Sequence, residues 1–165
     1  MCWPWFGPDP EGAGRPSHGF ARNRLWQVLR TEALADGQTQ VNLGFRDSDE
    51  TQALWPHAFE LALEITVGTT LKLALVSRNR SDIPFEITQA LHTYFTIGDI
   101  AQVAVLGLDG TRYIDKVDGG AVKPQVGAVA IASEVDRIYT GVPKELLIQD
   151  AALGRNIRIT SIGNQ

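Results

Sequence analysis

Cysteine is nearly absent from this sequence, and the classes of protein that depend on it are excluded. Cys2 is the one cysteine among 165 residues, so no disulfide can form within the chain. The three histidines lie far apart, so the close ligand pairs of a structural zinc site are missing as well. We therefore expect no metal and no cofactor, and a reducing compartment, with the cytoplasm as the default.

Long apolar runs and clustered positive charge are also lacking. No stretch approaches the length of a membrane span, and Pro4, Pro8 and Pro10 interrupt the apolar start, where a signal peptide needs a continuous run. Lys and Arg number 15 against 19 Asp and Glu, for a net charge of -4. The basic residues in 22–24 and 78–80 form runs too short for a basic stripe. Neither nucleic acid nor a membrane is an expected partner.

Helical periodicity is sparse, because the apolar period is two over most of the chain. Apolar and polar residues alternate in Phe59–Thr66 and again in Leu71–Leu75, after a turn that contains Gly68. These two segments are predicted to form an antiparallel hairpin. Further strands are expected at Leu25–Thr31, Gln40–Phe45, Phe85–Phe95, Gln102–Leu106, Thr111–Asp115, Ala128–Tyr139, Glu145–Gln149 and Asn156–Ile162.

Turn and helix signals complete an all-β prediction. Asp109-Gly110 and Leu153-Gly154 are expected to be hairpin turns. The residues 47–51 can cap one short helical turn that runs to Trp55 and stops at Pro56. No repeat or linker divides the 165 residues, which is an ordinary size for one domain. The prediction is a single domain over residues 1–165, an antiparallel β-sandwich or barrel.

His92 is the first candidate for chemistry, because it lies on the polar face of a long predicted strand. Strand parity across Phe85–Phe95 places His92 on the face opposite Leu91. An imidazole on the polar face of a sheet can hydrogen-bond a ligand and exchange a proton near neutral pH. The alternative is an ordinary strand histidine satisfied by a neighbour or by water, and the pattern alone leaves both open.

The second candidate is the segment 17–22, SHGFAR, which follows a loop rich in Gly and Pro. Gly19 lets the backbone approach a ligand closely, and His18 offers a donor. Arg22 offers a planar donor fork suited to a phosphate or to sugar oxygens. The alternative is a turn with a surface arginine. His57, the third histidine, is interpreted as structural.

The third candidate is Glu134–Tyr139. On a strand, Glu134 and Asp136 would share one face and could point toward a ligand. The alternative is a surface strand of alternating charge. A phosphate-binding glycine loop at the start of a helix is absent, because the glycines fall in predicted hairpins.

Six ordered segments, taken together, resemble those of a known family. They are CWPWFGP at 2–8, HGFAR at 18–22 followed by Trp26, WPHAFEL at 55–61, LVSRN at 75–79, ALHTYF at 90–95 and EVDRIY at 134–139. In this order and spacing they resemble the aldose 1-epimerase superfamily, in its hexose-6-phosphate mutarotase branch, also called glucose-6-phosphate 1-epimerase. The resemblance spans nearly all of the sequence.

The resemblance implies a fold, a reaction and a set of roles. The implied fold is an incomplete antiparallel β-sandwich of the galactose mutarotase-like type. The implied protein is an isomerase that interconverts the α and β anomers of a hexose 6-phosphate by acid/base ring opening. His92 would be the acid at the ring oxygen and His18 a second donor there, while Asp136 would hold ring hydroxyls and Arg22 the sugar phosphate.

The sequence departs from the family pattern at both ends. The general base of family members is a glutamate on a strand near their C-terminus, which has no counterpart here, and an upstream sugar-binding arginine is missing too. Removing a general base costs about 10²- to 10⁴-fold in rate. Two alternatives therefore stay open beside the enzyme. One is a non-catalytic carbohydrate-binding sandwich, and the other is a structural piece that self-associates through exposed strand edges.

Overall fold

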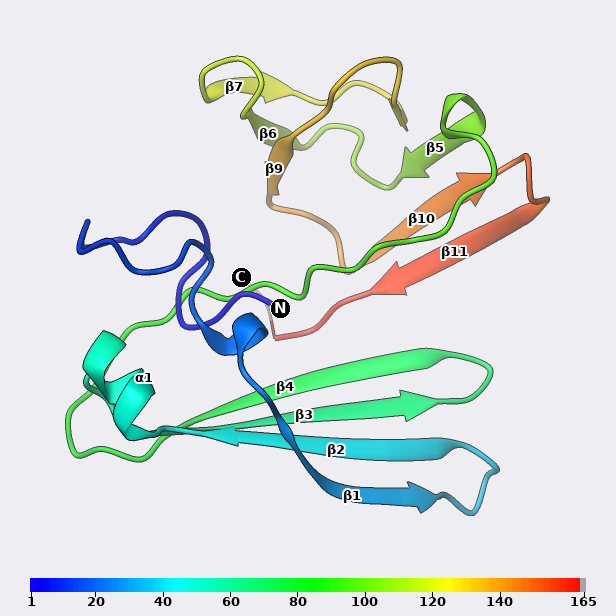
Figure 1. The fold of residues 1–165 in the computed structure, drawn as a ribbon. Helices are drawn as coiled ribbons and strands as arrows, with labels where there is room; N and C mark the ends of the chain where they lie inside the picture. The colour runs from blue at the N-terminus through cyan, green and yellow to red at the C-terminus, as the bar shows by residue number, and fades with distance from the viewer. Residues whose placement is uncertain (164–165) are drawn as a thin grey trace. The chain divides into compact units, whose positions relative to one another are not determined.

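The computed structural model describes residues 1–163, and nearly all of their regular structure is antiparallel β-strand (Figure 1). The predicted all-β class is confirmed. The chain forms two compact units, Met1–Thr93 and a second unit that begins at Tyr94. The expectation of a single domain over residues 1–165 stays a prediction. Among the described residues, no helix combines the length and the apolar character that a membrane crossing requires.

The first unit is built on one four-stranded antiparallel sheet in the order β1-β2-β3-β4 (Figure 1). The predicted hairpin is confirmed as β3 and β4, which pair from Phe59 opposite Asn79 to Val67 opposite Leu71. A 3₁₀ turn precedes the sheet and one short helix joins β2 to β3. The elements are η1 (Ala21–Asn23), β1 (Gln27–Ala33), β2 (Thr39–Arg46), α1 (Asp49–Leu54), β3 (Phe59–Val67) and β4 (Leu71–Asn79).

One face of this sheet carries the core of the first unit. Leu61 is buried and stands opposite Phe45 on β2 and Ser77 on β4, so these three side chains share a face. Aromatic rings from outside the sheet pack on this face: the Trp3 ring lies 4.5 Å from that of Phe59, centroid to centroid. The buried cluster comprises Trp3, Trp5, Phe20, Ala21, Trp55, Phe59 and Leu61.

The short helix begins where its sequence predicts. Ser48 is the N-cap, and its hydroxyl accepts a hydrogen bond from the Thr51 backbone N–H. The Thr51 hydroxyl accepts one in return from the Ser48 N–H at 2.9 Å, which completes a capping box. Because Thr51 is also buried, the cap fixes the helix against the sheet, and the chain turns at Trp55 into β3.

The second unit contains two small antiparallel sheets, in the orders β11-β10-β5-β8 and β7-β6-β9. Leu153-Gly154 lies in the turn between β10 and β11, which confirms that hairpin. The elements are η2 (Ile100–Gln102), β5 (Val103–Leu106), β6 (Arg112–Asp115), β7 (Ala121–Pro124), β8 (Val129–Ala130), β9 (Arg137–Thr140), β10 (Glu145–Asp150) and β11 (Arg155–Thr160).

The predicted strand Phe85–Phe95 is wrong. These residues form no strand, and one isolated antiparallel bridge joins Ala90 to Cys2. Next to this bridge, the Thr88 N–H donates to the Pro4 carbonyl at 2.9 Å, but proline has no N–H to return the bond. The ladder therefore stops after one bridge. His92 therefore does not lie on the polar face of a strand.

Two further predictions fail in the second unit, and both fail where the chain passes between sheets. Ala128–Tyr139 is not one strand, because β8 pairs with β5 in one sheet and β9 pairs with β6 in the other. The residues 131–136 connect the two sheets and have no strand structure. Asp109-Gly110 forms a turn but not a hairpin, since β5 and β6 also belong to different sheets. Strand β7, whose four residues follow two glycines and end at Pro124, was not predicted from the sequence.

Candidate functional site

The N-terminal segment 1–7 determines where two of the candidate histidines lie. Cys2 exchanges backbone hydrogen bonds with Ala90, at 2.8 and 3.1 Å. The neighbouring Trp3 is bridged to Gly19, and its carbonyl accepts from the Phe20 N–H at 3.1 Å. His92 follows Ala90 by two residues, and His18 directly precedes Gly19. The fold of the first unit thus attaches the two histidine-bearing segments to two consecutive residues, Cys2 and Trp3.

Gly19 makes the close approach to Trp3 possible. Its φ is +70°, and a Cβ placed on it would lie 2.0 Å from the Trp3 carbonyl oxygen. Only glycine fits that space. The preceding residue, His18, also has a left-handed φ of +66°, the one such value for a non-glycine residue among the described residues. A non-glycine residue held in this conformation is strained, and such strain is often found at functional sites.

The His18 ring is held in one tautomer by the backbone. The Gly7 N–H donates to Nδ1 of His18 at 3.1 Å, and the His18 N–H donates to the Gly7 carbonyl at 2.7 Å. Because a backbone N–H can only donate, Nδ1 must accept, and the ring hydrogen of neutral His18 is on Nε2. The ring also packs on Phe6, with centroids 5.1 Å apart. His18 therefore presents a fixed Nε2–H donor from a half-buried position.

Arg22 lies in the 3₁₀ turn η1, four residues after His18. Its side chain is exposed, and one Nη2 hydrogen is donated to the Ser17 carbonyl at 3.0 Å. A guanidinium carries five N–H donors, so this contact leaves donors for a ligand. The contact also ties Arg22 back to the start of the segment 17–22.

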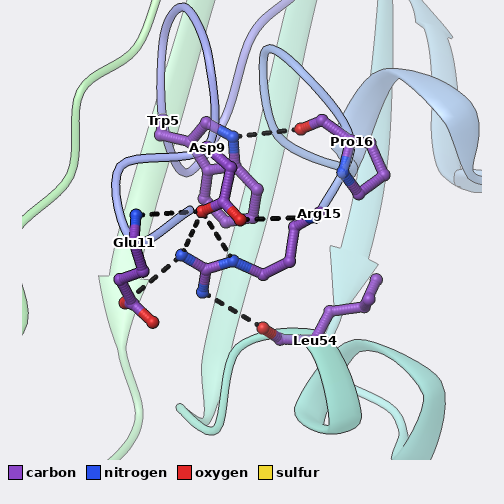
Figure 2. Close-up of polar contacts among 6 residues, drawn as sticks. All are labelled: Trp5, Asp9, Glu11, Arg15, Pro16 and Leu54. Atoms are coloured by element: carbon purple, nitrogen blue, oxygen red, sulfur yellow. Dashed lines mark hydrogen bonds and ion pairs between the residues drawn. The ribbon is translucent and has the colours of Figure 1, made fainter. Parts of the chain in front are cut away.

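A buried ion pair braces the loop in front of His18 (Figure 2). The Arg15 and Asp9 side chains are each only 7% exposed, with Nη2 of Arg15 2.5 Å from Oδ1 of Asp9. Arg15 also donates to the Leu54 carbonyl at 3.2 Å, and its guanidinium lies 4.5 Å from the centre of the Trp5 ring. Trp5 in turn donates from its indole nitrogen to the Pro16 carbonyl at 3.1 Å. The loop is thus fixed to the core cluster on one side and to α1 on the other.

The charges of this pair support each other. Hydrogen bonds from the Arg15 side chain hold the pKa of Asp9 well below its ordinary value of 3.8. The hydrogen bond to the Asp9 carboxylate in turn raises the pKa of Arg15 above its ordinary value. Neither residue was predicted from the sequence, because charged residues in a loop are expected to be exposed.

His57 and His92 differ in their surroundings. His57 is half-buried, and its ring packs 4.4 Å from that of Trp55 and 5.2 Å from that of Phe85, which supports the structural interpretation. His92 is exposed, on a segment without regular structure. An exposed imidazole is accessible to a ligand, as the role implied by the resemblance requires.

Asp136 belongs to the second unit, and its side chain is exposed. Its carbonyl accepts a hydrogen bond from the Lys116 N–H at 2.8 Å, directly before β9 begins. The expected strand face shared by Glu134 and Asp136 is not formed, because 131–136 lie outside the strands. The position of Asp136 at the entrance to β9 is instead fixed by its backbone.

Arg137, the neighbour of Asp136, is the best-organised polar side chain of this segment, and the sequence analysis gave it no role. Its guanidinium lies 4.3 Å from the centre of the Tyr113 ring. It also donates to the Gln125 side-chain carbonyl at 3.3 Å, which accepts a second bond from the Tyr139 hydroxyl at 2.8 Å. The hydrogen bond to the Tyr139 hydroxyl is the largest of the causes that raise the pKa of Arg137 above its ordinary value. This network stiffens the sheet β7-β6-β9 beside Asp136.

A surface hollow of about 370 Å³ lies in the first unit, on the strands β1, β2 and β3. None of the four candidate residues lines it. Its lining is Leu25, Gln27, Leu29, Gly44, Phe45, Arg46, Glu60, Leu61 and Ala62. Among the described residues no group of three His, Cys, Asp or Glu side chains is arranged to hold a metal ion.

Comparison with known proteins gives consistent relatives. The chain is 40% identical over 166 residues to a protein of Escherichia coli (strain K12) named "Putative glucose-6-phosphate 1-epimerase", with 100% of this chain and 53% of the relative covered. A protein of the same name from Cenchrus ciliaris is 33% identical, with 99% and 51% covered. The chain therefore spans about half the length of the curated relatives it matches.

Solved structures give the same result for the fold. A crystal structure described as "a putative mutarotase (YeaD) from Salmonella typhimurium" matches 96% of this chain and 52% of its own, with a TM-score of 0.88 and 38% identity. The Slr1438 protein from Synechocystis sp. PCC 6803 has a TM-score of 0.85 at 21% identity, over 96% of this chain and 57% of its own. The predicted mutarotase-like fold is confirmed.

The family model for aldose 1-epimerase matches residues 1–165. This match covers all six segments on which the resemblance rested, including those that carry His18, His92 and Asp136. The chain belongs to the aldose 1-epimerase family.

Proposed function

We propose that this chain supplies the proton-donating side of a hexose-6-phosphate mutarotase site and promotes the exchange of α and β anomers. The names of its relatives support the substrate class. The observation that carries the proposal is the fixed tautomer of His18: its Nδ1 accepts from Gly7, so its Nε2–H is a preorganised donor. Preorganised donors stabilise charge that develops on an oxygen during a reaction.

Anomer exchange needs two proton transfers on one sugar. A base removes the proton from the hydroxyl on C1, and an acid delivers a proton to the ring oxygen as the bond between that oxygen and C1 breaks. The resulting aldehyde rotates about the bond between C1 and C2, and the reverse steps close the ring with the other configuration. In our proposal His92 is the acid, and His18 donates to the ring oxygen as charge develops there. The base is proposed to be the glutamate that family members carry on a strand near their C-terminus.

Arg22 and Asp136 are proposed to hold the rest of the substrate. The exposed Arg22 guanidinium has donors left for the sugar phosphate, and a planar fork suits phosphate oxygens. The exposed Asp136 carboxylate accepts from sugar hydroxyls, and its backbone is fixed at the start of β9. Hexose phosphate is the proposed ligand, and the cytoplasm, where phosphorylated sugars are handled, is the proposed location.

The test measures anomer exchange of glucose 6-phosphate by NMR saturation transfer, with and without the chain. We expect exchange faster than the spontaneous rate, and a loss of about 10²- to 10⁴-fold of the added rate in His92→Asn. His57→Asn is the matched control, because it changes a histidine packed between Trp55 and Phe85. An unchanged rate in His92→Asn contradicts the assignment of the acid, and binding without faster exchange supports the non-catalytic carbohydrate-binding alternative.

The binding roles have a separate test. Arg22→Ala is expected to weaken the binding of glucose 6-phosphate and to leave that of glucose unchanged, because only the phosphorylated sugar carries the group that Arg22 is proposed to hold. Asp136→Asn is expected to weaken both. Titration calorimetry with the two sugars separates these outcomes, and equal effects of Arg22→Ala on both sugars contradict the phosphate role.

A further inference from the structure

Strand β1 is an outer strand of the sheet in the first unit, and its outer edge pairs with no strand among the described residues (Figure 1). Six of its seven residues are exposed, including Val28 and Leu29, which are 61% and 57% exposed. An open edge of this kind is a template for pairing with another strand. Proteins usually protect such an edge with charges, and β1 carries one charge of each sign, Arg30 and Glu32.

The regular part of this edge is short and well defined. A β-bulge interrupts the pairing of β1 with β2 between Val28 and Arg30. From Arg30 opposite Asn42 to Ala33 opposite Thr39 the ladder is regular. Bulges bend a strand and end its regular pairing, so the segment available to a partner is centred within Arg30–Ala33.

We propose that this edge pairs antiparallel with β1 of a second copy of the chain, centred on Thr31. In an antiparallel ladder, residues that direct their N–H and C=O toward the partner face each other. Along a strand, every second residue directs these groups toward the partner. In a pair of identical strands the numbers of two facing residues must therefore add to an even sum, which means that one residue faces its own copy across the two-fold axis. The two central positions of the four-residue regular segment are Thr31 and Glu32, and Arg30 is its first residue.

Charge selects one of these three registers. An axis through Arg30 places two arginines opposite each other, and an axis through Glu32 places two glutamates opposite each other. An axis through Thr31 places Arg30 of each copy opposite Glu32 of the other, so both charge pairs are complementary. Opposite charges that face each other across strands stabilise the pairing, and like charges oppose it.

The side chains within one copy are already arranged for this register. Arg30 and Glu32 form an ion pair with each other, which places both on one face of the strand. The result is a sheet continuous across two copies, with each β1 as a central strand.

Charge reversal tests the register directly. Arg30→Glu makes both charged positions of the edge acidic and Glu32→Arg makes both basic, so each variant repels its own copies. A mixture of the two variants has complementary charges at every facing pair. In sedimentation velocity over a wide range of concentrations, we expect the wild type to associate, each variant alone to bind at least about tenfold more weakly, and the equimolar mixture to recover the wild-type association.

Two matched controls make the same changes of charge elsewhere in the sheet. Lys72→Glu lies on the opposite outer strand β4, and Glu64→Arg lies on the inner strand β3; both residues are exposed. We expect both controls to associate as the wild type does. Recovery in the mixture shows that both edge variants are folded. A wild type that stays monomeric throughout, edge variants that associate normally, or a mixture that does not recover each overturns the proposal.

Discussion

Gly19→Ala should destabilise the first unit far more than an ordinary glycine replacement. A Cβ at residue 19 would lie 2.0 Å from the Trp3 carbonyl oxygen and 2.4 Å from its carbonyl carbon. Ordinary contacts begin at 3.4 Å, so the oxygen would have to move by 3.4 minus 2.0, or 1.4 Å. Trp3 is fully buried and its carbonyl accepts from the Phe20 and Ala21 N–H groups, so such a movement disturbs the core.

The magnitude follows from three contributions. A left-handed φ costs an alanine about 1–2 kcal/mol. Overpacking against a fixed core costs about 1–3 kcal/mol, and weakening the hydrogen bonds to the Trp3 carbonyl costs about 1 kcal/mol. The sum, about 3–6 kcal/mol, is a large share of the about 5–15 kcal/mol by which domains are stable.

Gly12→Ala is the matched control. Gly12 has nearly the same φ, +65°, but a Cβ there meets nothing within 4 Å. Only the conformational cost of about 1–2 kcal/mol applies. Urea unfolding followed by tryptophan fluorescence gives the free energy of unfolding of both variants. If Gly19→Ala and Gly12→Ala lose the same stability, the contact between Gly19 and Trp3 does not constrain the fold, and our account of how the His18 segment is positioned is refuted.

Three further predictions concern the ion pair of Asp9 and Arg15, the cap of helix α1, and Cys2. The low pKa of Asp9 means that its contribution to stability is complete above its ordinary value of 3.8 and is lost as the pH falls below it; Asp9→Asn should therefore be less stable at pH 7 and show a flatter acid limb in thermal unfolding. An unchanged acid limb would contradict this assignment. Ser48→Ala removes the hydroxyl that caps α1 and should lower the free energy of unfolding by about 1 kcal/mol in urea; no loss would show that the capping box is dispensable. Cys2 is 1% exposed, so a thiol reagent should modify it only after unfolding, and rapid modification of the native chain would contradict its burial.

The regular parts of the fold could be predicted from local pattern alone. Apolar residues recur at every second position through β3 and the first half of β4, and the turn between them is short, so the apolar period predicts both strands and their pairing. The short helix follows from its cap, since Ser48 and Thr51 satisfy each other locally. In both cases the interactions that decide the structure lie within a few residues of each other or across one hairpin.

The failures share a different cause. Phe85 and Ile87 do pack against the core, so the alternation there was a real signal of burial. Whether such a segment becomes a strand depends on its partner, and the partner here is a stretch more than 80 residues away that contains Pro4. Within Ala128–Tyr139 the chain leaves one sheet and enters another, and the spacing of the apolar residues does not reveal this change of sheet.

For the candidate site, too, only one part could be predicted from the sequence. Residue types and order were enough to single out His18, Arg22, His92 and Asp136, but not to describe their surroundings. The tautomer of His18 depends on the Gly7 N–H, and the rigidity of the loop depends on a buried pair of charged residues, Asp9 and Arg15. Charged residues in a loop are expected to be exposed, so burial of this pair could not be read from its composition.

The two compact units carry different natural chromophores. All four tryptophans of the sequence, at positions 3, 5, 26 and 55, lie in Met1–Thr93, and all three tyrosines, at positions 94, 113 and 139, lie beyond it. Indole emission thus reports on Met1–Thr93, and the tyrosine bands of the second-derivative absorbance spectrum report on the rest of the polypeptide, without any label. Superimposable melting curves from the two signals would mark a single cooperative transition, and displaced curves would mark two folding units.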